Sequence, residues 1–129
     1  MLINAIPQYI QNITNAKADL TGTGVVTLYT APSGGEFNAS VINSILVSED
    51  SGNADTLTVT LTNGSTVFSL FKVAAVGANA TVELLTHSLV LQGGEILKVQ
   101  AATGNRLHVV ASIQEYAQNR STTSTLSQI

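Results

Sequence analysis

The clearest pattern in the chain is an alternation of apolar and polar residues between Asp55 and Thr62. In this segment Leu57, Val59 and Leu61 are separated by threonines. A β-strand places alternate side chains on opposite faces of a sheet, whereas a helix would scatter both sets around its circumference. The pattern therefore predicts a strand with one buried face, on which each apolar side chain stabilises the fold by about 1.5–3 kcal/mol.

A turn and a second apolar segment follow this strand directly. Asn63-Gly64 tolerates the positive φ angles of a type I′ turn, whose twist matches that of the flanking strands. The two segments are therefore expected to form a β-hairpin. In the second strand, Phe68 and Leu70 are expected to face away from Val67 and Phe71. Burial on both faces would explain this pattern, and so would contact with another subunit.

Similar alternation recurs along most of the chain. Between 37 and 47 it predicts one face with Phe37, Ala39, Val41, Ile45 and Val47, opposite Asn38, Ser40 and Ser44. Near the end, Leu107, Val109, Ala111 and Ile113 oppose Arg106, His108 and Ser112. Further strands are expected at 24–30, 80–85, 88–91 and 95–101. Short strands at this spacing, without helical periodicity between them, predict an all-β fold. We expect an antiparallel two-sheet sandwich of about eight strands, either jelly-roll or immunoglobulin-like.

The two ends of the chain do not follow this pattern, so we divide it into an N-terminal arm (1–21), a β-sandwich domain (22–116) and a C-terminal tail (117–129). Ordering such segments alone costs about 1–2 kcal/mol per residue. They are therefore expected either to fray or to lie across a neighbouring chain. The candidate partner-contact residues are the apolar side chains of the arm: Leu2, Ile3, Ile6, Tyr9, Ile10 and Ile13.

Composition narrows the classes of partner. The 129 residues suit one domain, and only 10% of them are charged, with a net charge of −3. No basic patch is available to neutralise phosphates, so nucleic-acid binding is not expected. Thr, Ser and Asn total 38 residues, which makes the polar surface mostly neutral. Such a surface lets subunits pack side by side without strong charge repulsion.

Three further features bear on compartment and chemistry. The sequence has no cysteine, which excludes disulfides, thiol catalysis and thiolate metal sites. The first residues lack the basic segment and the long apolar run of a signal peptide. No stretch approaches the roughly 18 apolar residues of a membrane span, so no membrane partner is expected.

Candidate catalytic and metal-binding residues are few. His87 and His108 are the only imidazoles, and Glu83 or Glu95 is a possible partner for them. Neither histidine has a metal-ligand spacing, and His108 falls on the polar face of a strand. A solvated side chain is therefore expected.

Two short motifs are interpreted as turns. The oxygen-rich run 50–55 suits calcium ligation, but it lacks the twelve-residue loop with a final Glu, and its Asp, Gly and Asn also suit a turn. Gly22-Thr23-Gly24 precedes a strand and has no following Lys-Ser/Thr of a phosphate loop. No serine lies in a Gly-x-Ser-x-Gly setting. We therefore expect no catalytic residue, no metal site and no cofactor.

Four segments together resemble small β-sandwich virion proteins of tailed bacteriophages. They read "TLYTAP" followed by Gly34-Gly35, "SILVSEDSG", "LVLQGGEILKVQA" and "LHVVASI". The resemblance covers residues 24–115 and rests on strand and turn patterns. It excludes the arm and the tail.

The resemblance implies a non-enzymatic virion component that self-associates around a symmetry axis and is assembled in the host cytoplasm. It favours a capsid cement or decoration protein, a homotrimer on the outer surface of the shell that the major capsid protein forms. The alternatives are a neck, collar or tail-fibre component, or a carbohydrate- or receptor-binding module. Sugar sites usually stack a ring on an aromatic side chain, and the sequence has no Trp and only three Tyr and three Phe.

Overall fold

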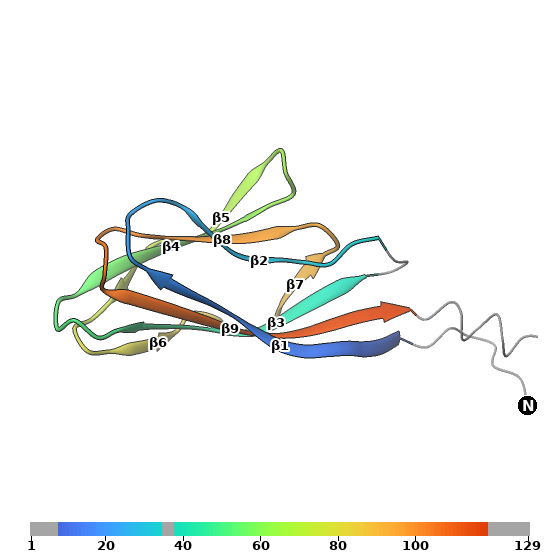
Figure 1. Ribbon diagram of the computed structural model, residues 1–129, viewed down its shortest axis with the longest axis horizontal. Coiled ribbons are helices and arrows are strands. Elements are labelled where there is room, and N and C mark those ends of the chain that lie inside the picture. The colour runs from blue at the N-terminus through green and yellow to red at the C-terminus, as the bar shows by residue number, and fades with distance from the viewer. Residues whose placement is uncertain (1–7, 35–37, 119–129) are drawn as a thin grey trace, which may run out of the picture.

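The computed structural model describes residues 8–34 and 38–118, which form an all-β fold without a helix in that part of the chain (Figure 1). The described residues form nine strands: β1 (Gln8–Leu20), β2 (Val26–Thr30), β3 (Ala39–Glu49), β4 (Asp55–Thr62), β5 (Val67–Val76), β6 (Thr81–Glu83), β7 (Leu89–Gln92), β8 (Ile96–Ala101) and β9 (Leu107–Gln118). The prediction of an antiparallel two-sheet sandwich is confirmed.

The strands form two antiparallel sheets that face each other (Figure 1). The five-stranded sheet has the order β1-β9-β3-β6, and β7 also pairs with β3. The four-stranded sheet has the order β2-β8-β4-β5. As a result, β1 and β5 are long strands at the open edges of their sheets.

The core lies between the sheets and is built from the alternating apolar positions. Leu57 and Val59 of β4 are fully buried, as are Val109 and Ala111 of β9. The polar neighbours of these residues point outward, as a period of two requires. The alternation that predicted these two strands therefore predicted their buried faces correctly.

The predicted hairpin is present as β4 and β5, but its turn differs from the expectation. Thr62 pairs with Val67, so the loop has four residues, not two. Gly64 has a positive φ of 103°, but Asn63 does not, which excludes a type I′ turn. The Asn63 side chain instead accepts hydrogen bonds from the backbone N–H groups of Ser65 and Thr66. The Thr62 hydroxyl group also accepts from the Gly64 N–H group at 3.1 Å, so side-chain hydrogen bonds hold this loop.

The predicted faces of β3 are wrong over the first half of the strand. A bulge between Ile42 and Ser44 shifts the register against β9. Before the bulge, Ser40 and Ile42 point inward and are buried, so Val41 points outward. After it, Ile45 and Val47 point inward as expected. One extra residue reverses the faces of a strand.

Most of the predicted N-terminal arm is a strand of the sandwich. Residues 8–20 form β1, which pairs with β9 in a continuous register from Asn12 to Leu20. Leu20 is buried in the core. The sequence of this strand showed no steady period for two reasons. A bulge between Ile10 and Asn12 interrupts the alternation. The inner face of β1 also carries short, partly exposed residues such as Ala16 and Ala18, which give a weak apolar signal.

At the other end of the chain, β9 extends through residues 117 and 118 of the predicted C-terminal tail, and 119–129 lie outside the described residues. Over the described part of the chain, no helix has the length and apolarity that a membrane crossing requires.

Candidate functional site

An apolar band crosses the outer face of the five-stranded sheet. The strand register places Ile13, Gln114, Val41 and Val90 side by side in one row across β1, β9, β3 and β7. The adjacent row contains Ile10, Tyr116 and Ala39. We call the apolar residues of these two rows the outer band: Ile10, Ile13, Ala39, Val41, Val90 and Tyr116.

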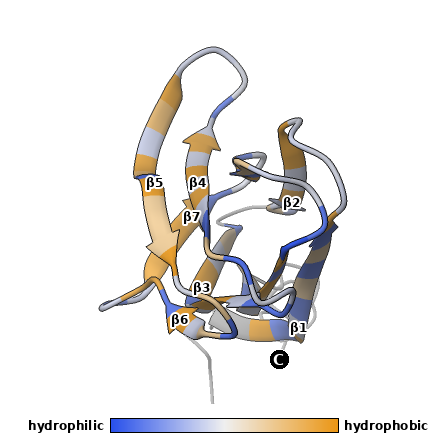
Figure 2. Ribbon diagram, turned by 90° about the vertical axis from the view of Figure 1, so that its left-hand side faces the viewer, coloured by the Kyte–Doolittle hydropathy of each residue, from blue (hydrophilic) through white to orange (hydrophobic). Residues whose placement is uncertain are grey.

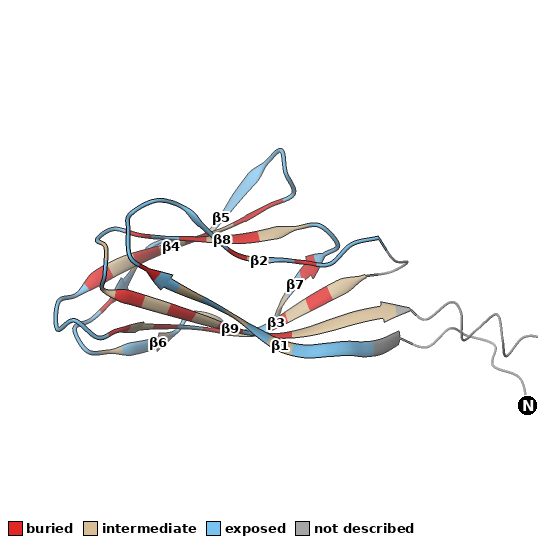
Figure 3. Ribbon diagram, in the orientation of Figure 1, coloured by how far each residue is buried: buried red, intermediate tan, exposed pale blue. Residues whose placement is uncertain are grey.

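The outer band is open to solvent. Ile13 is 73% exposed, Val90 57% and Ile10 47%, whereas Val41 and Tyr116 are half-buried. Figure 3 shows β1 as exposed along the stretch that carries Ile10 and Ile13. Single exposed apolar residues are normal on a protein surface, but a contiguous apolar area that spans several strands is typical of a protein contact.

The structure describes two of the six predicted partner-contact residues. Ile10 and Ile13 lie in the outer band. Tyr9 belongs to β1, but its side chain is outside the described set. Leu2, Ile3 and Ile6 lie entirely outside the described residues. Val41 and Val90 were not predicted as contact residues, because their outward direction depends on the bulge in β3 and on the pairing of β7 with β3.

Exposed apolar side chains also lie along β5, at the open edge of the four-stranded sheet, on both faces of the strand: Phe68 pairs with Leu61 of the inner face, and Val67 pairs with Thr62 of the opposite face. Val67 is 65% exposed, Val73 57% and Phe68 49%. We call these three residues the β5 edge. Figure 2 shows β5 as a largely hydrophobic strand at the margin of the molecule. Burial on both faces within the chain therefore does not explain the apolar pattern of Val67 and Phe68, although Leu70 and Phe71 do pack partly against the core.

A polar cluster joins the two sheets beneath the outer band. The Tyr29 hydroxyl group on β2 donates to Glu115 Oε2 on β9 at 2.5 Å, and it lies 2.8 Å from Ser40 Oγ on β3. Because the phenol proton is given to the carboxylate, Ser40 is the donor to Tyr29. Burial and the hydrogen bond to Glu115 raise the pKa of Tyr29 to about 12, against the smaller opposing effect of Ser40.

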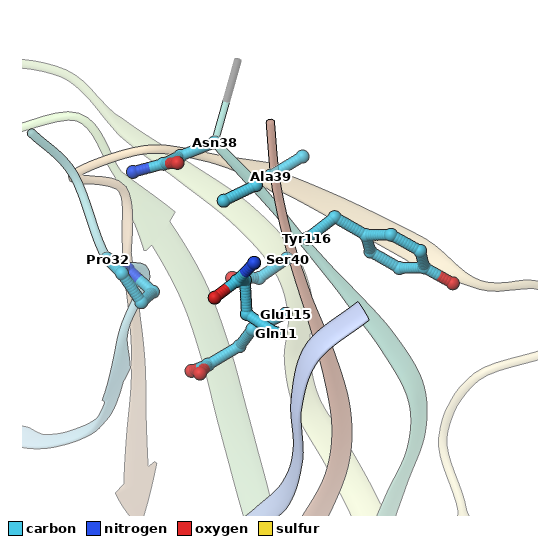
Figure 4. Close-up of a pocket in the computed structure, with 8 residues that line it drawn as sticks. Gln11, Pro32, Asn38, Ala39, Ser40, Glu115 and Tyr116 are labelled. Carbon is cyan, nitrogen blue, oxygen red and sulfur yellow. The ribbon is translucent and has the colours of Figure 1, made fainter. Parts of the chain in front are cut away.

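A cleft of about 220 Å³ lies beside this cluster, lined by Gln11, Pro32, Asn38, Ala39, Ser40, Glu115, Tyr116 and Ala117 (Figure 4). Small-molecule sites usually measure about 300–1,000 Å³. Glu115 also accepts from Asn12 Nδ2 at 3.3 Å, so both of its carboxylate oxygens are engaged by the protein. The cluster therefore acts as a structural junction between the sheets.

A second junction lies at the opposite end of the sandwich, around Glu49. The buried Glu49 carboxylate accepts from the backbone N–H groups of Ser51, Gly52 and Asn79 at 2.7–3.1 Å, and also from the Ser51 hydroxyl group. Burial alone would raise the pKa of Glu49, but these hydrogen bonds together lower it to about 2. The carboxylate thus holds the β3–β4 and β5–β6 connections, both of which cross between the sheets.

The oxygen-rich run 50–55 is a turn, as the residue types favoured. Gly52 has a positive φ of 84°, and Glu49 binds the backbone of the loop. Asp55 is buried and accepts from the Thr103 N–H group at 3.0 Å. Gly22-Thr23-Gly24 connects β1 to β2 and is followed by a strand, not by the helix that a phosphate loop requires.

The two histidines lie in different parts of the fold, His108 on β9 and His87 in the β6–β7 connection. His108 Nε2 lies 3.2 Å from Asp19 Oδ1, and its Nδ1 lies 3.5 Å from Asp50 Oδ2, with 43% of the imidazole side chain exposed. His87 is exposed in the β6–β7 connection.

The two candidate carboxylate partners of the histidines bind the chain's own backbone. Glu83 accepts from the N–H groups of Ile45 and Leu85, and Glu95 from that of Gln92. Within 8–34 and 38–118, no group of three His, Asp or Glu residues has an arrangement that would hold a metal ion.

No protein-family model matches the chain, and no curated protein is similar to it in sequence. Solved structures share its architecture. A chain of infectious bursal disease virus, Gx strain, superposes with a TM-score of 0.52 and 10% identity, over 88% of this chain and 30% of the viral chain. A chain of the Bacillus endospore appendages, which form disulfide-linked pili, gives a TM-score of 0.50 and 10% identity, over 88% of this chain and 89% of the pilus chain.

A pentameric capsid protein from metagenomic phage sequences gives a TM-score of 0.46 and 17% identity. This match covers 85% of our chain, which spans 65% of the capsid protein's length. At such low identities, the likenesses to the bursal disease virus chain and to the pilus chain establish the fold alone.

Proposed function

We propose that this chain is a non-enzymatic structural protein of a virus particle, specifically a cement or decoration protein. In this role it associates with itself as a trimer, binds the outer surface of the shell that the major capsid protein forms, and stabilises that shell. The virion is then its location, reached by assembly in the host cytoplasm. The sequence resemblance over 24–115 supports the virion assignment, and the sandwich fold is compatible with it.

The observation that carries the proposal is the outer band. Its two rows contain no charged side chain, and they reach the open edge of the sheet at Ile10 and Ile13. Burying apolar area stabilises a contact by about 25 cal/mol per Å². A surface of this kind suits permanent contact with other protein chains better than it suits the binding of a small, charged ligand.

The proposal is tested on virus particles purified from cells that carry the gene, with an antibody raised against the purified chain. Gold label distributed over the shell supports the cement role. Label confined to the neck or tail overturns that role in favour of a neck, collar or tail-fibre component. Purified particles that contain none of the chain overturn the virion assignment altogether.

A carbohydrate- or receptor-binding module is the second candidate, and Phe68 is the observation that favours it. An aromatic side chain that is 49% exposed on an edge strand is available to stack on a sugar ring. Binding of the purified chain to a glycan array, lost in Phe68→Ala and retained in Val90→Ala, would support this function over the structural one. An array without any bound glycan would count against it.

A further inference from the structure

Both edges of the five-stranded sheet are open in the described part of the chain. β1 forms one edge, and β7 and β6 lie along the opposite edge, where each of them pairs only with β3. Edge strands carry unpaired backbone N–H and C=O groups, to which another chain can add. The β5 edge on the other sheet is no comparable surface, because Val67 and Phe68 lie on opposite faces of the strand.

The outer band runs from one of these two edges to the other. Its longer row ends in Ile13 on β1 and in Val90 on β7, and both side chains are exposed. The apolar row is therefore open at both ends. A neighbouring copy beside either edge would continue it.

A second row of the same face ends in opposite charges. The register aligns Lys17 on β1 with Val110 on β9, Leu46 on β3 and Glu83 on β6. Lys17 and Glu83 are both exposed. Burial opposes the charged form of Glu83, but one side-chain and two backbone hydrogen bonds together lower its pKa, so the carboxylate is charged at neutral pH. We call this row the charged row.

The two rows have the same spacing at both edges of the sheet. They cross β9 four residues apart, and Ile13 and Lys17 are also four residues apart on β1. A neighbour whose β1 lies beside β7 and β6 therefore brings Ile13 to Val90. The same placement brings together the opposite charges at the two ends of the charged row.

Strand direction agrees with this placement. All neighbouring strands in the sheet are antiparallel, so β7 and β6 run opposite to β1. The β1 strand of a copy that lies beside them, with its outer face on the same side, is then antiparallel to both. The β6–β7 connection (84–88) separates the apolar pair from the charged pair, so the two pairs are separate contacts and not one continuous ladder.

A contact between two β1 edges does not satisfy both rows at once. An antiparallel pairing that sets Ile13 opposite Ile13 of the other copy sets Lys17 opposite Tyr9, which has no negative charge. A pairing that sets Lys17 opposite Asp19 sets Ile13 opposite position 23, beyond the end of β1. The β1 edge is therefore better matched to the β7 and β6 edge than to itself.

We propose that the β1 edge of one copy lies beside the β7 and β6 edge of the next copy, so that the five-stranded sheets continue from copy to copy around an axis. At each contact Ile13 packs against Val90, and Lys17 pairs with Glu83. Because two different edges meet, the contact is head-to-tail, and such contacts close into a ring when the rotation between neighbours allows it. This inference rests on the self-association part of the proposed function and identifies its surfaces.

Engineered disulfides test the apolar pair, because the sequence has no cysteine of its own. Within one copy, Ile13 and Val90 are three strand spacings apart, about 14 Å, which is too far for a disulfide. On mild oxidation, a mixture of Ile13→Cys and Val90→Cys is expected to form dimers with one chain of each kind. Neither variant alone is expected to do so. A mixture of Ile13→Cys with Val67→Cys, an exposed position on the other sheet, is the matched control and is expected to give no dimers.

The double variant Ile13→Cys with Val90→Cys distinguishes a ring from a two-fold contact. Head-to-tail contacts are expected to give covalent species of more than two chains, whereas two faces packed around a two-fold axis stop at two. A double variant that stops at two chains, efficient dimers of either single variant alone, or a mixture without dimers would each overturn the inference.

The charged pair is tested by Lys17→Glu in the full chain. By light scattering after size exclusion at micromolar concentration, the wild type is expected to have at least three times the 13.4 kDa chain mass. Lys17→Glu sets two carboxylates against each other and is expected to weaken association about three- to tenfold. Lys72→Glu makes the same charge change on an exposed position of β5 and is expected to associate like the wild type. Glu83 itself is left unchanged, because its carboxylate also binds the backbone of its own chain.

A monomeric wild type, or a Lys17→Glu variant that associates as strongly as Lys72→Glu, would overturn the inference. A wild type that associates without any of the expected cross-links would overturn these surfaces but leave the proposed self-association in place. These outcomes are separate from the particle test, since rings can form from a chain that no particle contains, and particles can contain a monomeric chain.

Discussion

The outer face of the four-stranded sheet carries Thr56, Thr58 and Thr60 on β4, whereas the corresponding face of the five-stranded sheet carries Ile13, Val41 and Val90. The inner faces of both sheets carry buried apolar side chains that form one shared core, beside the polar junction of Tyr29, Ser40 and Glu115. The fold therefore requires apolar residues on the inside only. The outer band is not part of this core, and the proposed contact with another chain accounts for its apolar character.

The largest expected effects come from the inner faces, where the two sheets should behave alike. Leu57→Ala in β4 and Ile45→Ala in β3 both truncate fully buried side chains. Each variant is expected to lower the free energy of unfolding by about 2–5 kcal/mol because it leaves a cavity in the shared core. Urea unfolding measures this. If only one of the two variants lowered the free energy of unfolding, the comparison would fail, because the two sheets would then not share one core.

The attachment of β1, which brings Ile13 to the outer band, can be weakened at Gly104. A Cβ atom at this position would lie 2.5 Å from the carbonyl oxygen of Thr21, directly after β1. Because the obstacle is backbone, Gly104→Ala is expected to destabilise the chain by about 1–3 kcal/mol in thermal or urea unfolding. Gly22→Ala is the matched control, because a Cβ atom there has nothing within 4 Å. Equal stability of the two variants would contradict this prediction.

The Glu49 junction, which ties the ends of both sheets, predicts a response to acid. The pKa of Glu49 is lowered from 4.5 to about 2 in the folded chain. The folded state therefore holds this carboxylate in its charged form more strongly than the unfolded chain does, and the resulting stability is complete above pH 4.5 and is lost as the pH falls toward 2.

In Glu49→Gln the fall in unfolding free energy between pH 4.5 and pH 2 is expected to be shallower than in the wild type. Ser51→Ala keeps the backbone donors of Ser51, Gly52 and Asn79, so it should change the slope less. Acid denaturation monitored by circular dichroism measures both. Identical slopes in the wild type and Glu49→Gln would show that the junction does not depend on the charge.

The smallest effects on folding are expected when a valine of one outer face is replaced by threonine and a threonine of the other outer face by valine. Val90→Thr and Thr60→Val should each change the unfolding free energy of the separated chain by no more than about 0.5 kcal/mol. Their effects on association should differ, because only Val90 belongs to the outer band. Light scattering is expected to show weaker association for Val90→Thr and no weakening for Thr60→Val. Weaker association in both variants would remove the distinction between the faces.

Local residue patterns were sufficient to predict the fold class. Leu57, Val59 and Leu61 identify a half-buried strand because the side chains of a strand alternate wherever it lies in a sheet. Asn63-Gly64 identifies a reversal of the chain for an equally local reason. The interruption at Ile42–Ser44 was invisible, since a bulge is defined against the partner strand, here β9, and not within β3 itself.

The candidate surfaces were only partly predictable. Ile10 and Ile13 stood out because they are apolar residues outside any regular pattern. Val41 and Val90 looked like ordinary core residues, and only their pairing across β3 and β7 places them on the outer face. The junction of Tyr29 with Glu115 joins residues 86 positions apart, so no spacing within the sequence indicates it.

By itself, the sequence determined that the chain forms short antiparallel strands around a single core, because period-two burial is a property of each segment alone. Only the tertiary structure decided that residues 8–20 become an edge strand beside β9, which apolar side chains face outward, and which edges stay open. Those features depend on register and on strand order, which are set by partners distant in the sequence. Strand pairing therefore decides which residues form the surface proposed for assembly, although each of these residues can be read directly from the sequence.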